Sequence, residues 1–132
     1  MKSWKPTLAL IVLTLVFTMS EALYSKSRVI VADAVTGDAI TAHCYSKDDD
    51  LGTHQLAYLQ SFSWTFRYSL IGSTEFFCTI STQYGSGNYM VYGNDIMLNR
   101  CGLNCLWQVQ AGGPCLQQTR GGLWCQPWQK HA

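Results

Sequence analysis

His43 and His54 are the residues of this sequence that most readily suggest catalysis. A secreted hydrolase or ribonuclease would use one imidazole as general base and the other as general acid, with Lys47 or Arg67 as the cation that stabilises the transition state. Nothing in the spacing of these residues requires that chemistry. His43 also adjoins Cys44 in a β-rich run, so the two side chains should point to opposite faces of a strand. We therefore expect structural histidines and keep the enzyme as the alternative.

A run of three aspartates lies between the two histidines, at positions 48–50. Carboxylates bind calcium, but an EF-hand loop spaces its ligands at alternate positions and ends in a bidentate glutamate, and neither feature is present. The run instead predicts a solvated turn, with Gly52 supplying unusual backbone angles, and we expect no metal or cofactor. The residues of this exposed loop are Lys47, Asp48, Asp49, Asp50 and Leu51.

Six cysteines form the second group of reactive side chains. Cys101 and Cys105 have no histidine motif near them, which disfavours a zinc site. An even number of cysteines in a small exported chain indicates disulfides, and six cysteines allow 15 pairings between which sequence alone does not choose. The predicted disulfide cysteines are Cys44, Cys78, Cys101, Cys105, Cys115 and Cys125.

The N-terminus has the three-part layout of a secretory signal. Lys2 and Lys5 precede an apolar run over residues 8–17, and the small residues Ser20 and Ala22 follow. The run is shorter than the roughly 18 residues that span a bilayer. We therefore predict a signal peptide over residues 1–22, and a domain over residues 23–132 that is secreted, extracellular and not membrane-spanning after cleavage.

The number and distribution of charged residues disfavour some classes of partner. Of nine basic and eight acidic residues, Lys2, Lys5 and Glu21 fall in the predicted signal, so the remaining domain carries seven of each. Its basic residues are scattered, and nothing predicts the phosphate binding that a nucleic-acid partner requires. An antimicrobial defence protein, a further alternative, is commonly cationic and amphipathic, and this domain is neither.

The domain reads as short strands separated by turns. The clearest strand covers residues 62–68, where aromatic residues alternate with polar ones at the period of a half-buried strand. No later stretch shows sustained helical periodicity, so we expect an all-β fold, a small disulfide-stabilised antiparallel β-sandwich. The other predicted strands are 28–32, 40–45, 54–59, 75–80, 88–92 and 105–109.

Five motifs in order resemble the plant self-incompatibility S1 family, the S-protein homologues. They are HCYSKDDDLGTH at 43–54, FSWTF at 62–66, FFC at 76–78, RCGLNCLW at 100–107 and GPC at 113–115. The chain departs from the family in having Asp33 where an asparagine is usual, in lacking any Asn-x-Ser/Thr sequon after the signal, and in having Thr82 where an aromatic is frequent. Cys125 and the tryptophan-rich tail lie beyond the matched motifs, although Trp124 and Trp128 predict that this tail is tied down.

The resemblance implies a secreted signalling ligand rather than an enzyme. In poppies, members of the family act as the stigma's self-incompatibility determinant and are perceived by a pollen membrane protein. The implied partner is therefore a cell-surface receptor, with pollen–pistil recognition as the narrower expectation. Exposed loops are where a sandwich contacts a receptor, so we expect contact at residues 47–53, with 71–74 and 83–88 as secondary segments.

Two structural expectations complete the prediction. Cys44, Cys78, Cys105 and Cys115 should form two framework disulfides, with Cys101 and Cys125 left to form a third. The largest aromatic side chains should fill the core between the two sheets, because a domain this small needs them there. These predicted core residues are Trp64, Phe66, Phe76, Phe77 and Trp107.

Overall fold

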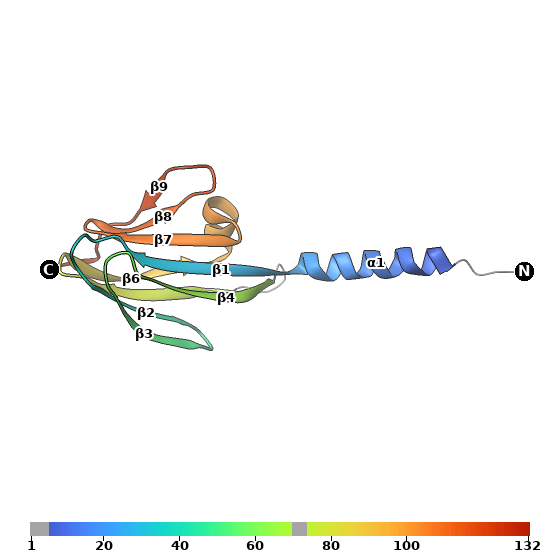
Figure 1. The fold of residues 1–132 in the computed structure, drawn as a ribbon, viewed down its shortest axis with the longest axis horizontal. Helices are drawn as coiled ribbons and strands as arrows, with labels where there is room; N and C mark the ends of the chain where they lie inside the picture. The colour runs from blue at the N-terminus through green and yellow to red at the C-terminus, as the bar shows by residue number, and fades with distance from the viewer. Residues whose placement is uncertain (1–5, 70–73) are drawn as a thin grey trace, which may run out of the picture.

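The computed structural model describes residues 6–69 and 74–132, with residues 6, 16–25 and 69 described at the backbone only. The helix α1 (Pro6–Leu23) projects away from an all-β domain (Figure 1). The short helix α2 (Asn94–Ile96) and one π-helical turn, η1 (Met97–Cys101), connect two of the strands. The strands are β1 (Tyr24–Asp33), β2 (Ile40–Ser46), β3 (Asp50–Leu56), β4 (Ser61–Ser69), β5 (Phe76–Ser81), β6 (Gly85–Tyr92), β7 (Asn104–Gln110), β8 (Gly113–Gln117), β9 (Leu123–Cys125) and β10 (Lys130–His131).

These strands form two five-stranded sheets that pack as a sandwich. One sheet has the order β4-β1-β7-β8-β9 and the other the order β10-β6-β5-β2-β3. The predicted all-β, disulfide-stabilised sandwich is therefore confirmed, with one departure from an antiparallel arrangement. β1 and β7 run parallel, from Arg28 opposite Asn104 to Asp33 opposite Val109. A parallel pair needs a long crossover, and here the crossover contains β2 to β6.

The strand predicted over residues 54–59 is displaced toward the N-terminus. β3 occupies Asp50–Leu56, and residues 57–60 form the turn into β4. In this turn the Gln60 N–H donates to the Ala57 carbonyl oxygen over 2.9 Å, and Leu59 has a φ of 71°. Tyr58 and Leu59 are exposed despite their apolar side chains. The predicted strand was misplaced because it included the apolar residues 57–59, which lie in this turn.

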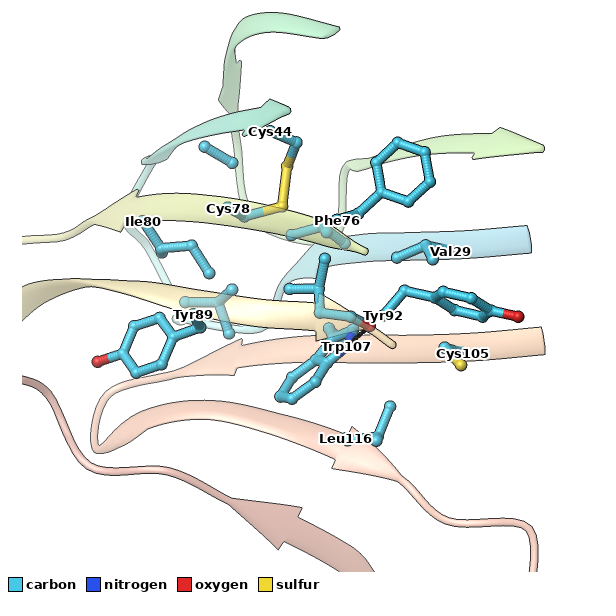
Figure 2. Packing of buried hydrophobic residues seen from close by; sticks show 14 of the residues in the cluster. Val29, Cys44, Phe76, Cys78, Ile80, Tyr89, Tyr92, Cys105, Trp107 and Leu116 are labelled. Carbon is cyan, nitrogen blue, oxygen red and sulfur yellow. Dashed lines mark hydrogen bonds between the residues drawn. A yellow bond between two sulfur atoms is a disulfide. The ribbon is translucent and has the colours of Figure 1, made fainter. Parts of the chain in front are cut away.

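Trp107 lies at the centre of the core (Figure 2), fully buried, and its indole N–H donates to the Val91 carbonyl oxygen over 2.9 Å. Phe76 is also buried, and Trp64 and Phe66 pack half-buried against it with ring centroids 5.4 and 4.7 Å away. These four predicted core residues therefore lie in the core or against it. The core is continuous across both sheets.

Phe77 was predicted to lie in the core and does not. Successive residues of a strand face opposite sides of the sheet, so Phe77 points outward once Phe76 points inward. On the outer face Phe77 stacks with Tyr45 of β2, at a centroid distance of 5.9 Å and an interplanar angle of 23°. The prediction failed because a double aromatic hides the period-two pattern.

All six cysteines lie in disulfides, in pairs that differ from the predicted grouping. Cys44 of β2 bonds Cys78 of β5, which is its direct neighbour across the sheet (Figure 2). Cys105 bonds Cys101 across the end of η1, and Cys115 of β8 bonds Cys125 of β9. The prediction wrongly placed Cys105 and Cys115 among the four cysteines of the two framework disulfides. Each instead bonds a cysteine close in sequence, which η1 or the β8–β9 hairpin brings within bonding distance.

The C-terminal tail joins the two sheets. β9 belongs to the sheet of β1, whereas β10 pairs with β6 in the other sheet. Between them the buried Trp128 donates its indole N–H to the Ala111 carbonyl oxygen over 2.8 Å. Gly85 and Gly113 allow this contact: a Cβ would lie 2.5 Å from the Trp128 ring at Gly85, and 1.9 Å from the Gln126 carbonyl oxygen at Gly113.

A buried carboxylate sits where β1 enters the loop to β2. Asp33 is 1% exposed, and one carboxylate oxygen accepts the Val35 N–H over 2.7 Å. Its other oxygen, and Oδ2 of Asp38, are buried without a hydrogen-bond partner among the described residues. Burial raises the pKa of Asp33, the Val35 N–H opposes that shift, and the charge of Asp38 adds to it.

Candidate recognition site

The predicted contact loop forms the tip of the β2–β3 hairpin. β2 ends at Ser46 and β3 begins at Asp50, so only residues 47–49 form the turn. The Ser46 N–H donates to the Asp49 carbonyl oxygen over 2.7 Å, and the Asp49 N–H donates to Ser46 Oγ over 3.1 Å. These two hydrogen bonds close the turn and fix the direction in which its side chains point.

Asp50, although in the predicted loop, is held in place by its neighbours. Its Oδ1 accepts the Gly52 N–H over 2.9 Å and lies 2.7 Å from Nε2 of His43 on the facing strand. The Gly52 hydrogen bond and then the His43 contact lower the pKa of Asp50. Gly52 has a φ of 84°, which suits glycine and agrees with the predicted unusual backbone angles.

The five residues of the predicted loop therefore divide into two groups. Lys47, Asp48 and Asp49 are exposed, and none forms an ion pair within residues 6–69 and 74–132. Asp50 and Leu51 belong to β3, where Leu51 packs half-buried against the core. The charged turn 47–49 is the part that is available to a partner.

The two histidines point to opposite faces of their sheet. Ala42 pairs with His54 and His43 pairs with Thr53, and residues paired across two strands share a face. Ala42 is fully buried, so His54 faces inward, where its ring stacks on Phe62 of β4 at 3.6 Å. His43 faces outward toward Asp50. A general acid and a general base acting on one substrate must both reach it, and this pair does not.

A cleft of about 440 Å³ opens beside the charged turn, where the end of β4 meets the start of β5. Its charged lining comes from Lys47, Asp48 and Asp49 of the turn and from Arg67 and Glu75, and aromatic side chains also line it. Sequence reasoning did not find this cleft, because its walls come from segments that only the fold brings together. The nearest signal was the number of aromatics in residues 62–77.

The secondary contact segments are less available. Of residues 71–74, only Thr74 lies within the described residues, and it lines the cleft. Within 83–88, Gly85 is covered by Trp128, and Asn88 donates its side-chain amide to the Tyr45 hydroxyl and to Thr79 Oγ1. In the same part of the chain, Tyr84 is exposed.

A metal-binding cluster and a membrane-spanning helix are both absent among the residues that the structure describes. No group of three or more His, Cys, Asp or Glu side chains is arranged to hold a metal ion. Within the same residues, no helix combines the length and apolar character needed to cross a membrane. The site is thus defined by surface charge and by the adjoining cleft.

Comparison with known proteins places this disulfide-bonded sandwich in a class. Residues 28–128 match the family model of the plant self-incompatibility protein S1. S-protein homolog 1 of Arabidopsis thaliana is 36% identical over 95 residues, which cover 70% of this chain and 63% of the relative. S-protein homolog 74 of the same plant is 38% identical over 92 residues, covering 67% and 61%. The chain belongs to the plant self-incompatibility S1 family.

The extent of these matches adds two facts. The family match reaches residue 128, so Cys125 and Trp128, which the motifs alone left outside the resemblance, lie within the family region. The chain covers less than two thirds of the length of S-protein homologs 1 and 74. No solved structure matches it.

Proposed function

We propose that this protein is a secreted, non-enzymatic signalling ligand that a cell-surface receptor recognises through the charged turn 47–49. The turn supports this proposal because its backbone is fixed by two hydrogen bonds while Lys47, Asp48 and Asp49 have no ion-pair partner among the described residues. A fixed backbone lowers the conformational entropy lost on binding. Unpaired charges favour a complementary partner and discriminate against others.

Secretion is supported by three observations. Three disulfides fit an oxidising compartment. Residues 1–22 have the layout of a signal peptide. α1 projects away from the sandwich, and β1 begins at Tyr24, directly after the predicted cleavage site (Figure 1). Pollen–pistil recognition is the narrower part of the proposal and draws on the name of the family that the chain matches.

The test measures binding to living cells. The full-length chain is expressed in a eukaryotic secretory host, and the exported product is sequenced at its N-terminus, labelled and applied to pollen tubes and other plant cells. We expect an N-terminus at Leu23 and saturable binding that unlabelled protein displaces. The absence of saturable binding on every tissue would refute the ligand proposal.

A charge-reversal variant tests the turn itself. Asp48→Lys combined with Asp49→Lys should weaken cell binding about tenfold or more, because like charges placed against each other in an interface cost several kcal/mol and a tenfold loss needs only about 1.4 kcal/mol. Asp50 is left unchanged, since it holds the hairpin together. Asp95→Lys, which reverses an exposed charge on α2, is the matched control and should bind normally. Equal binding by all three proteins would exclude the turn as the contact.

The hydrolase alternative is less well supported, because His43 and His54 point to opposite faces of one sheet. It predicts turnover that disappears in His43→Ala and His54→Ala while the fold survives. Assays of RNA and ester hydrolysis with the exported protein and these two variants compare the alternatives directly.

A further inference from the structure

The cleft beside the charged turn has an aromatic lining. Phe66 and Phe76 line it from the two sheets with ring centroids 4.7 Å apart, and Tyr45 and Phe77 line it as a stacked pair. A volume of about 440 Å³ falls within the roughly 300–1,000 Å³ of sites that bind small ligands or anchoring side chains. The cleft therefore has the size and the apolar surface to hold one large apolar group.

The rim of the cleft carries charges that have no partner within the described residues. Asp48, Asp49 and Glu75 are acidic, Lys47 and Arg67 are basic, and none of the five takes part in an ion pair there. Acidic groups outnumber basic ones, so the rim favours a ligand that places a basic group beside its apolar one. The rim thus adds charge selectivity to the apolar lining.

β4, which forms one wall of the cleft, is an edge strand. It pairs with β1 from Ser69 to Ser61, and no strand among the described residues pairs with its other side. An edge strand presents unpaired N–H and C=O groups, and an extended peptide can add to it while pockets select its side chains. A polypeptide can use both the edge and the cleft, whereas a small molecule can use only the cleft.

We propose that the cleft binds an extended segment of the receptor. The segment adds to the free edge of β4, inserts one large apolar side chain beside Phe66 and Phe77, and brings a basic side chain to Asp48, Asp49 and Glu75. This inference rests on the proposed function and adds to it the kind of partner that the site recognises. It makes the turn 47–49 one wall of the site instead of the whole contact.

Selection of random displayed peptides on the exported, oxidised protein tests the chemistry without knowledge of the receptor. We expect the enriched peptides to share a large apolar residue next to Lys or Arg. Their binding should weaken about tenfold or more in Phe77→Ser and in Glu75→Lys, since each variant removes one part of the recognition. Leu123→Ser on β9 and Asp95→Lys on α2 make the matched changes away from the cleft and should bind normally.

Glu75→Lys keeps the test independent of folding, because Glu75 is exposed and its replacement leaves the core intact. Enriched peptides without a common pattern, or with equal affinity for the cleft variants and their controls, would overturn the inference. A cleft that retains only small organic molecules from a mixed library would also overturn it.

Cell binding by the same variants separates this inference from the proposed function. Saturable cell binding that Glu75→Lys leaves unchanged would refute the receptor segment in the cleft and leave the ligand proposal intact. Peptide binding that depends on the cleft, together with no saturable binding to any cell, would refute the ligand proposal and with it the receptor as occupant. Loss of both peptide binding and cell binding in Glu75→Lys supports the receptor segment in the cleft as well as the ligand proposal.

Discussion

Replacing Asp33 with asparagine should stabilise the domain at neutral pH. The Asp33 carboxyl is 1% exposed, and one of its oxygens has no hydrogen-bond partner among the described residues. Asparagine keeps an oxygen for the Val35 N–H and replaces the unpartnered oxygen with an amide donor. We expect that donor to reach the buried, unpartnered oxygen of Asp38, whose charge contributes to the raised pKa of Asp33.

The magnitude follows from the cost of an unpaired buried acceptor, which is about 1–3 kcal/mol. We therefore expect Asp33→Asn to raise the free energy of unfolding at pH 7 by about 1–3 kcal/mol. For a domain of this size, about 4 °C of melting temperature corresponds to 1 kcal/mol, so the melting temperature should rise by about 4–12 °C.

The raised pKa of Asp33 also determines the direction in which stability changes with pH. Burial raises the pKa of Asp33 in the folded state above its ordinary value of 3.8, so the folded domain binds this proton more tightly than the unfolded chain does. The wild-type protein therefore loses stability as pH rises from below 3.8 through the raised pKa. Asp33→Asn lacks that loss, and the gap between the two proteins should close as pH falls.

Thermal and urea unfolding of the oxidised protein between pH 3 and 8, followed by circular dichroism, measures both effects. Asp48→Asn makes the same chemical change at an exposed, unpaired carboxylate and should leave stability unchanged. An Asp33→Asn protein that is less stable than wild type at pH 7, or whose advantage does not depend on pH, would refute the reasoning. Either result would mean that Asp33 has a partner in solution.

Three further predictions concern the covalent frame, the tail and the hairpin. Replacing both cysteines of the β2–β5 disulfide with alanine should lower the free energy of unfolding by about 3.8 kcal/mol, and the same change at the η1 disulfide by about 1.9 kcal/mol. The difference arises because the first disulfide closes 34 residues and the second 4. Urea titration of the two variants measures both losses. Gly113→Ala should release the tail, because its Cβ would overlap the Gln126 carbonyl oxygen. A Cβ at Gly112 meets nothing, so Gly112→Ala is the control. Limited proteolysis detects the released tail. Asp50 should titrate below 3.8 by NMR, and His43→Ala should raise its pKa.

Sequence patterns predicted individual strands well, because the alternation of side chains along a strand depends only on the residues of that strand. The alternation of residues 62–68 predicted β4 within a residue at each end, and the aromatic residues of that strand face inward as expected. The predicted turn of residues 47–53 fell at the right hairpin but was too long. The structure begins β3 at Asp50, which pairs with Tyr45 of β2 and contacts His43 through its side chain, and no local pattern encodes contacts across the hairpin.

Features that depend on distant segments were not predictable in the same way. The cleft combines β4, the start of β5 and the β2–β3 turn, and each part alone has an ordinary sequence. The parallel pairing of β1 with β7 follows from sheet order, which hydrophobic periodicity does not specify. Disulfide pairing failed although the partners of Cys105 and Cys115 lie close in sequence, because the η1 turn and the β8–β9 hairpin that bring them together were not predicted.

The order of synthesis gives the C-terminal tail a further role. β9 belongs to one sheet, β10 pairs in the other, and Trp128 fills the space over Gly85, so residues that are made after β7 and β8 link the two sheets. A ribosome adds about 5–20 residues per second, and during that time the edge of β1 that pairs with β7 has no partner. A chain that stops before residue 128 lacks Trp128 and leaves the space over Gly85 open, so we expect it to expose apolar surface that the intact sandwich covers.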